Sequence, residues 1–121
     1  MEIISKILIG FVAAEHLFFF YFEMFAWETV GKKVFGGVLP KELFKSTKML
    51  AANQGLYNGF LVAGLVWSLI ITNAEWANNV AIFFLSCVIV AGTYAGLTSS
   101  RKILLVQAFP AILALIFVLM R

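Results

Sequence analysis

Four long apolar stretches limit what this chain can fold into. They cover residues 3–27, 50–72, 80–98 and 103–120, so little of the 121-residue chain lies between them. Each is close to the ~20 residues that an α-helix needs to cross the hydrocarbon core of a membrane. Because lipid offers no partner to backbone N–H and C=O groups, a spanning segment must be a helix or part of a closed barrel. The stretches are continuous rather than alternating, which excludes a barrel.

The composition agrees with membrane helices. Hydrophobic residues make up 63% of the chain and charged residues only 12%, which is too few to cover the surface of a soluble domain. The first stretch is also too long, and too polar within, for a cleaved signal peptide. We therefore predict an all-α integral membrane protein, a four-helix bundle that forms a single domain over residues 1–121.

The basic residues predict the orientation in the cell membrane. The connection Glu28–Met49 contains five lysines, and the short third connection contains Arg101 and Lys102, whereas the opposite side has only Lys6 and Arg121. An excess of seven basic residues against two marks the cytoplasmic side. We expect a multi-pass protein with both termini extracytoplasmic. The basic residues form no patch among stacking aromatics, so the net charge of +3 predicts no nucleic-acid partner.

The long first connection contains a second helical pattern. After Pro40, apolar residues recur at helix-like spacing as far as Leu50, and proline is well suited to the first turn of a helix. Two interpretations fit this pattern equally. The segment is a short amphipathic helix on the cytoplasmic interface, or it is an early start of the second span.

Two glutamates and the only histidine lie inside the first apolar stretch, within the segment AAEHLFFFYFEMFAWE (residues 13–28). The predicted orientation places Glu15 and the only histidine, His16, near the membrane midplane, and Glu23 near the cytoplasmic interface. An ionised side chain at the bilayer centre costs about 2.5–3.5 kcal/mol, so we expect these groups to face the bundle interior. His16 and Glu23 are seven residues apart and share a helix face, whereas Glu15 points about 100° away from His16.

The second and fourth stretches add polar residues in the same cytoplasmic half. We expect Asn53, Gln54 and Asn58 to face the first helix, because stranded amides are costly in hydrocarbon. These groups either form hydrogen bonds between helices or line a polar pocket that opens to the cytoplasm. The candidate ligand- or proton-binding residues are Glu15, His16, Glu23, Asn53, Gln54, Tyr57, Asn58 and Gln107.

Two further features of the sequence concern how the helices pack and whether a cofactor is bound. Gly55 and Gly59 form a GxxxG pattern, as do Gly92 and Gly96, which favours close helix contact either within one chain or between the two chains of a homodimer. One cysteine excludes an intrachain disulfide. No pair of histidines stands at metal-binding spacing, and one histidine cannot supply bis-histidine haem ligation. We expect neither a metal nor another cofactor.

Several motifs together resemble a known family. AEHLFFFYFEMFAWE, KKVFGG, AANQGLYNGFLVAGLVW, CVIVAGTYAG and QAFPAILAL are similar to the motif set of small bacterial four-helix membrane proteins known as domain of unknown function thirteen-oh-four. The resemblance covers nearly the whole chain and implies a single membrane domain without an assigned activity. A weaker similarity is to small multidrug-resistance transporters, which also carry one glutamate midway along their first helix, where Glu15 stands here. The long first connection and strong charge bias depart from them, so this similarity is an analogy only.

Three functions are compatible with these residues. The one we favour is a membrane protein that binds or transports a small protonatable or cationic ligand in a cytoplasm-facing pocket, held against Glu15. The alternative is a membrane enzyme or redox-partner subunit that acts on a lipid-soluble quinone or isoprenoid, with His16 as acid or base and Glu15 poising it. The third is a structural or assembly protein with a buried hydrogen-bond network. The lipid bilayer is an expected partner in all three cases.

Overall fold

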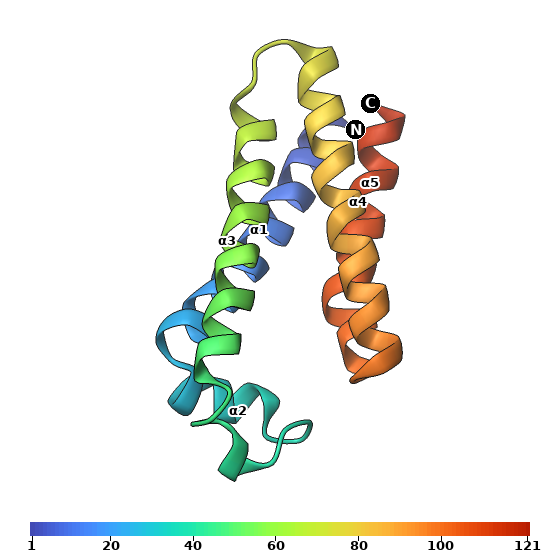
Figure 1. Cartoon of the computed structure of the whole chain (residues 1–121). Helices are drawn as coiled ribbons and strands as arrows, with labels where there is room; N and C mark the ends of the chain where they lie inside the picture. The colour runs from blue at the N-terminus through green and yellow to red at the C-terminus, as the bar shows by residue number, and fades with distance from the viewer.

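The chain folds into helices joined by one long and two short connections. A computed structural model describes all 121 residues. Its long helices are α1 (Glu2–Phe25), α3 (Lys48–Ile70), α4 (Ala74–Thr98) and α5 (Phe109–Met120), which run up and down beside one another (Figure 1). The shorter elements are the π-helical turns η1 (Trp27–Gly31) and η3 (Leu104–Ala108), the short helix α2 (Lys32–Phe35) and the 3₁₀ turn η2 (Lys41–Leu43). The all-α prediction is therefore confirmed.

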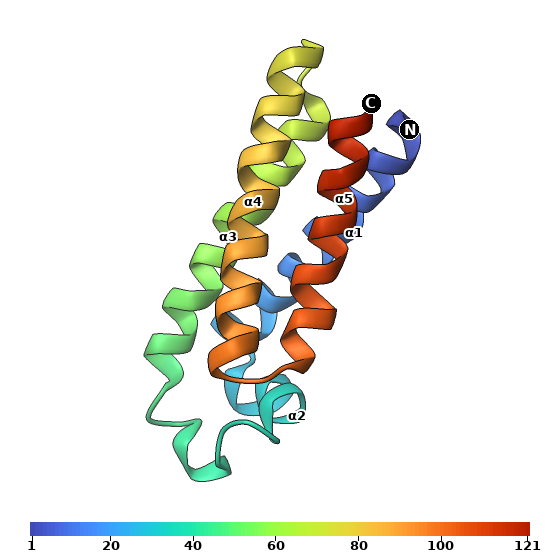
Figure 2. The same ribbon diagram turned by 90° about the vertical axis from the view of Figure 1, so that its right-hand side faces the viewer.

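The helices alternate in direction, so the connections divide between two ends of the molecule. Both termini and the α3–α4 connection lie at one end, and α2 and the α4–α5 turn lie at the other (Figures 1 and 2). The most extensive packing is between α1 and α3, and α4 packs on both η3 and α5. This arrangement places the basic first connection and the basic third connection at the same end.

Helix α4 begins earlier than the sequence predicted. The expected third span started at residue 80, whereas α4 begins at Ala74. The side chain of Asn73 accepts a hydrogen bond from the backbone N–H of Trp76 at 3.0 Å and so caps the first turn. An asparagine cap stabilises the N-terminus of a helix, and apolar periodicity alone does not show where such a cap lies.

The long connection forms neither of the two structures expected after Pro40. Only the three residues of η2 form a 3₁₀ turn, and α3 does not begin until Lys48. The reason is a contact with the end of α1. Phe44 is fully buried, with its ring centroid 4.9 Å from that of Trp27, and Trp27 Nε1 donates a hydrogen bond to Thr47 Oγ1 at 3.0 Å. These contacts hold the connection against the bundle as a compact cap.

The core is small and the apolar surface is large. Only 24 of the 121 residues are buried, whereas thirty-two large hydrophobic side chains are exposed. Two helices, α1 and α4, are long and apolar enough to cross a membrane by length and composition, and the apolar segment Leu104–Met120 is shorter. The central cluster comprises Ile9, Val12, Ala13, Leu65, Ala81, Leu85, Val88, Ala111, Ala114 and Val118.

Both GxxxG motifs form contacts within the chain. A Cβ atom added to Gly55 would lie 3.0 Å from the backbone nitrogen of Met24 in α1. A Cβ atom added to Gly92 would lie 3.0 Å from the backbone nitrogen of Ala108 in η3. The absence of a side chain at each position lets two helices approach closely, so both motifs serve the packing of a single chain.

Candidate functional site

The structure links the residues of α1 to two different helices. His16 bonds to Gln107, and Glu23 bonds to Asn58. The first pair joins α1 to the η3–α5 segment, and the second joins α1 to α3. The two bonds therefore connect helices that are far apart in sequence, at positions about two turns apart along one face of α1.

His16 is completely buried and both of its ring nitrogens have partners. Nδ1 lies 2.8 Å from the carbonyl oxygen of Val12, and Nε2 lies 3.0 Å from Nε2 of Gln107. A carbonyl oxygen only accepts, so Nδ1 carries the proton, and the amide nitrogen only donates, so His16 Nε2 is the acceptor. This arrangement requires the neutral imidazole. Phe19 packs edge-on at a centroid distance of 5.1 Å.

A local widening of the helix precedes α5 and carries Gln107. Pro110 has no N–H to donate to the carbonyl of Val106, so an ordinary α-helical ladder is broken there. The chain forms the π-helical turn η3 instead, in which the N–H of Phe109 bonds to the carbonyl of Leu104. Such single-turn insertions are frequent at functional sites, and here one contains the partner of His16.

Glu23 lies at a close approach of α1 and α3. Asn58 Nδ2 donates a hydrogen bond to Glu23 Oε1 at 2.5 Å, and Gly55 leaves room for the Cβ atom of Glu23 beside it. No basic side chain pairs with Glu23. The ion pairs of the molecule are Lys6–Glu2 and Lys48–Glu28.

Glu15 lies on a different face of α1 and is partly buried. Its Oε1 atom is enclosed and has no hydrogen-bond partner, and no basic side chain pairs with it either. A buried acceptor that is left without a donor costs about 1–3 kcal/mol. Glu15 is therefore the one buried side-chain acceptor whose bonding is incomplete.

Three of the expected residues lie on the surface instead. Asn53, Gln54 and Tyr57 are exposed, and none has a side-chain hydrogen bond within the chain. The expectation that Asn53, Gln54 and Asn58 all face α1 holds for Asn58 alone. Gly55 and Gly59 occupy the face of α3 that meets α1, and Gly59 lies beside the ring of Phe20. Because these glycines face α1, the neighbouring polar positions of α3 point outward.

A third polar cluster, which the sequence interpretation missed, lies at the opposite end of the molecule. Arg121 donates from Nε to Asn78 Oδ1 at 2.7 Å and from Nη1 to Ser5 Oγ at 2.9 Å. Ser5 is completely buried, so this cluster ties α1, α4 and the end of α5 together. Ser5 precedes His16 by three helical turns and shares its face. That spacing was the available signal.

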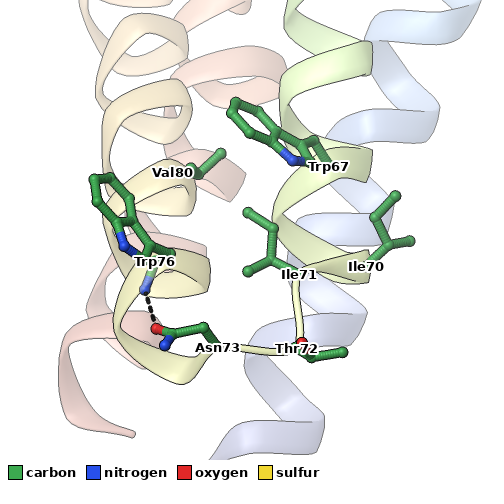
Figure 3. A pocket seen from close by; sticks show the side chains of 7 residues that line it. All are labelled: Trp67, Ile70, Ile71, Thr72, Asn73, Trp76 and Val80. Atoms are coloured by element: carbon green, nitrogen blue, oxygen red, sulfur yellow. Dashed lines mark hydrogen bonds between the residues drawn. The ribbon is translucent and has the colours of Figure 1, made fainter.

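Two surface pockets lie away from these residues. The larger, about 470 Å³, is an open hollow between the end of α3 and the start of α4 (Figure 3). Its lining residues are Trp67, Ile70, Ile71, Thr72, Asn73, Trp76 and Val80. The smaller, about 280 Å³, is an apolar groove between α1 and α3. Neither contains a residue of the predicted polar site.

Fold and contacts together define an all-helical protein that carries two carboxylates and a histidine in its first apolar helix. The chain belongs to the family described as protein of unknown function (DUF1304), whose model matches residues 10–119. It is also 34% identical over 117 residues to the uncharacterized protein YpaA of Lactococcus lactis subsp. lactis (strain IL1403), a match that covers 96% of this chain and 97% of that protein. The family resemblance seen in the motifs is thus confirmed. The chain matches no solved structure.

Proposed function

We propose that the protein is a multi-pass membrane protein that binds or transports a small protonatable or cationic ligand at the carboxylates of α1. Exposed apolar side chains support the membrane location. They occur on all four long helices and outnumber the buried residues, and a soluble monomer rarely exposes apolar surface on this scale. In this proposal α3 and α5 cross the membrane beside α1 and α4, and the end with α2 faces the cytoplasm.

The enclosed oxygen of Glu15 carries the ligand part of the proposal. Oε1 is buried without a donor, and a proton or an N–H group of a bound ammonium would complete its bonding. Glu23 receives only a neutral amide hydrogen bond and lacks an ion-pair partner. Two carboxylates in an apolar helix, without a basic side chain to balance them, favour a small cation over an anion or a neutral substrate.

His16 has a supporting role in this proposal. Both of its ring nitrogens are engaged within the protein and its ring is fully buried. A catalytic acid or base needs a nitrogen that reaches the substrate, so the geometry gives less support to the enzyme alternative. We propose that the hydrogen bond between His16 and Gln107 instead holds the η3–α5 segment beside the two carboxylates of α1.

A direct test measures the binding of benzylamine, a small amine that is protonated at neutral pH, to the purified full-length protein in detergent. Isothermal titration calorimetry compares wild type, Glu15→Gln and Glu75→Gln. Glu75 is an exposed carboxylate in the first turn of α4 and provides the matched control. We expect Glu15→Gln to weaken binding at least ~tenfold, about 1.4 kcal/mol, and Glu75→Gln to leave it unchanged. Wild-type protein that does not bind, or equal binding by Glu15→Gln and wild type, would reject the proposal.

A further inference from the structure

The distribution of free positive charge differs sharply between the two ends of the bundle. At the end that contains α2, all seven basic side chains are exposed. Only one of them is paired, Lys48 with Glu28, at 3.7 Å. The unpaired ones are Lys32, Lys33, Lys41, Lys45, Arg101 and Lys102.

The opposite end lacks such free cations among its side chains. Lys6 pairs with Glu2 at 3.3 Å, and Arg121 is bound to Asn78 and Ser5. Glu75 is exposed nearby in the first turn of α4. The basic side chains that are both exposed and without an ion-pair partner therefore all lie at one end of the molecule.

The basic end also carries exposed apolar side chains on a segment that is held in place. Val34, Val38 and Leu43 are each between 42% and 45% exposed, and they lie in the same segment of the chain as four of the lysines. Phe44 is buried against Trp27, and Thr47 accepts a hydrogen bond from the same indole. The connection is thus fixed to the end of α1, and it lies at the same end of the molecule as the α4–α5 turn (Figure 2).

We infer that this end of the bundle, formed by α2, η2 and the α4–α5 turn, is a binding surface for the headgroups of anionic phospholipids. The inference rests on the membrane location in the proposed function. Clusters of four to eight basic residues next to a membrane helix attract anionic lipids, and interleaved apolar side chains enter the boundary between headgroups and acyl chains. Each basic residue near such a surface contributes roughly fivefold to the affinity.

Lipid binding to the purified full-length protein in detergent provides the test. Microscale thermophoresis compares short-chain phosphatidylglycerol with phosphatidylcholine of the same chain length. The variants are the triple substitution Lys33→Gln, Lys41→Gln and Lys45→Gln, the triple Lys-to-Arg substitution at the same positions, and the control Lys6→Gln. We expect wild type, the arginine variant and Lys6→Gln to prefer phosphatidylglycerol at least ~tenfold, and the glutamine variant to lose most of that preference.

Several results would overturn the inference. Equal affinity of wild type for the two lipids would do so, as would an unchanged preference in the glutamine variant. Inorganic phosphate that displaces the lipid at constant ionic strength would assign the surface to soluble anions instead, and equally tight binding of a single-stranded oligonucleotide would assign it to nucleic acid. Failure here is separable from failure of the proposed function, because Glu15→Gln should keep the lipid preference and the triple glutamine variant should still bind benzylamine.

Discussion

At the scale of single residues, the bond between His16 and Gln107 is expected to stabilise the bundle. Replacing either residue by alanine leaves the other, the buried His16 or the partly buried Gln107, without its partner. A double-mutant cycle of His16→Ala and Gln107→Ala, followed by unfolding in mixed micelles, should give a coupling free energy of roughly 0.5–2 kcal/mol. Strictly additive effects would show that the two side chains do not interact.

The pair formed by Glu23 and Asn58 makes a second residue-scale prediction with a neighbouring control. Asn58→Leu removes the donor to a partly buried carboxylate, whereas Asn53 is exposed and has no side-chain partner. We expect Asn58→Leu to lower the free energy of unfolding by about 1 kcal/mol and Asn53→Leu to leave it unchanged or raise it. The same micelle unfolding assay measures both. Equal effects of the two substitutions would show that the hydrogen bond contributes nothing.

Residue identity predicted which groups are unusual, but it predicted their partners less well. Glu15, His16 and Glu23 are conspicuous because titratable groups are costly in an apolar helix. Whether Asn53 or Asn58 reaches α1 depends on the rotation of α3 about its axis, which Gly55 sets through close contact. The bond of Gln107 to His16 depends on the π-turn η3. Pro110 indicates a break in the helix at that point, but helical spacing does not show which side chain Gln107 then reaches.

At the scale of elements, the contact between α1 and α3 depends on Gly55. Alanine at this position would place a Cβ atom 3.0 Å from the backbone nitrogen of Met24, and backbone cannot move aside cheaply. We expect Gly55→Ala to cost about 1–3 kcal/mol of stability through overpacking. Circular dichroism during unfolding in mixed micelles provides the measurement.

Gly10 is the matched control for this prediction. It also lies within a long helix, but a Cβ atom there meets nothing within 4 Å. Gly10→Ala should therefore be neutral or stabilise the protein by up to about 1 kcal/mol, because alanine is the better helix former. If Gly55→Ala were as stable as Gly10→Ala, α1 and α3 would not pack as closely as described.

The long helices were predictable because continuous apolar stretches report them directly, whereas the connections were not. Helix α1 ends within two residues of the end of the first apolar stretch. The first connection was misjudged because its structure depends on Trp27, which lies 17 residues before Phe44 and packs on it. The start of α4 depends on a single side-chain cap by Asn73. Both are tertiary or local polar effects that apolar periodicity does not report.

At the scale of the whole molecule, the distribution of basic residues in the sequence and the arrangement of the helices both separate the molecule into a basic end and an end that holds the termini. The basic first and third connections lie together, and both termini lie at the other end (Figures 1 and 2). The sequence predicted this grouping because an even number of spans returns the chain to its starting side. The number of crossings itself is part of the proposal, since α1 and α4 alone meet the length and apolarity expected of a span.

Both proposed binding sites depend on a topology with four membrane crossings and the α2 end in the cytoplasm. Cysteine labelling in intact cells tests this topology most directly. Single cysteines replace the exposed residues Thr72 and Lys33 in a Cys87→Ala background. We predict that an impermeant maleimide labels position 72 in intact cells and reaches position 33 only after the membrane is permeabilised. Labelling of position 33 in intact cells, or of both positions equally, would contradict the proposed topology.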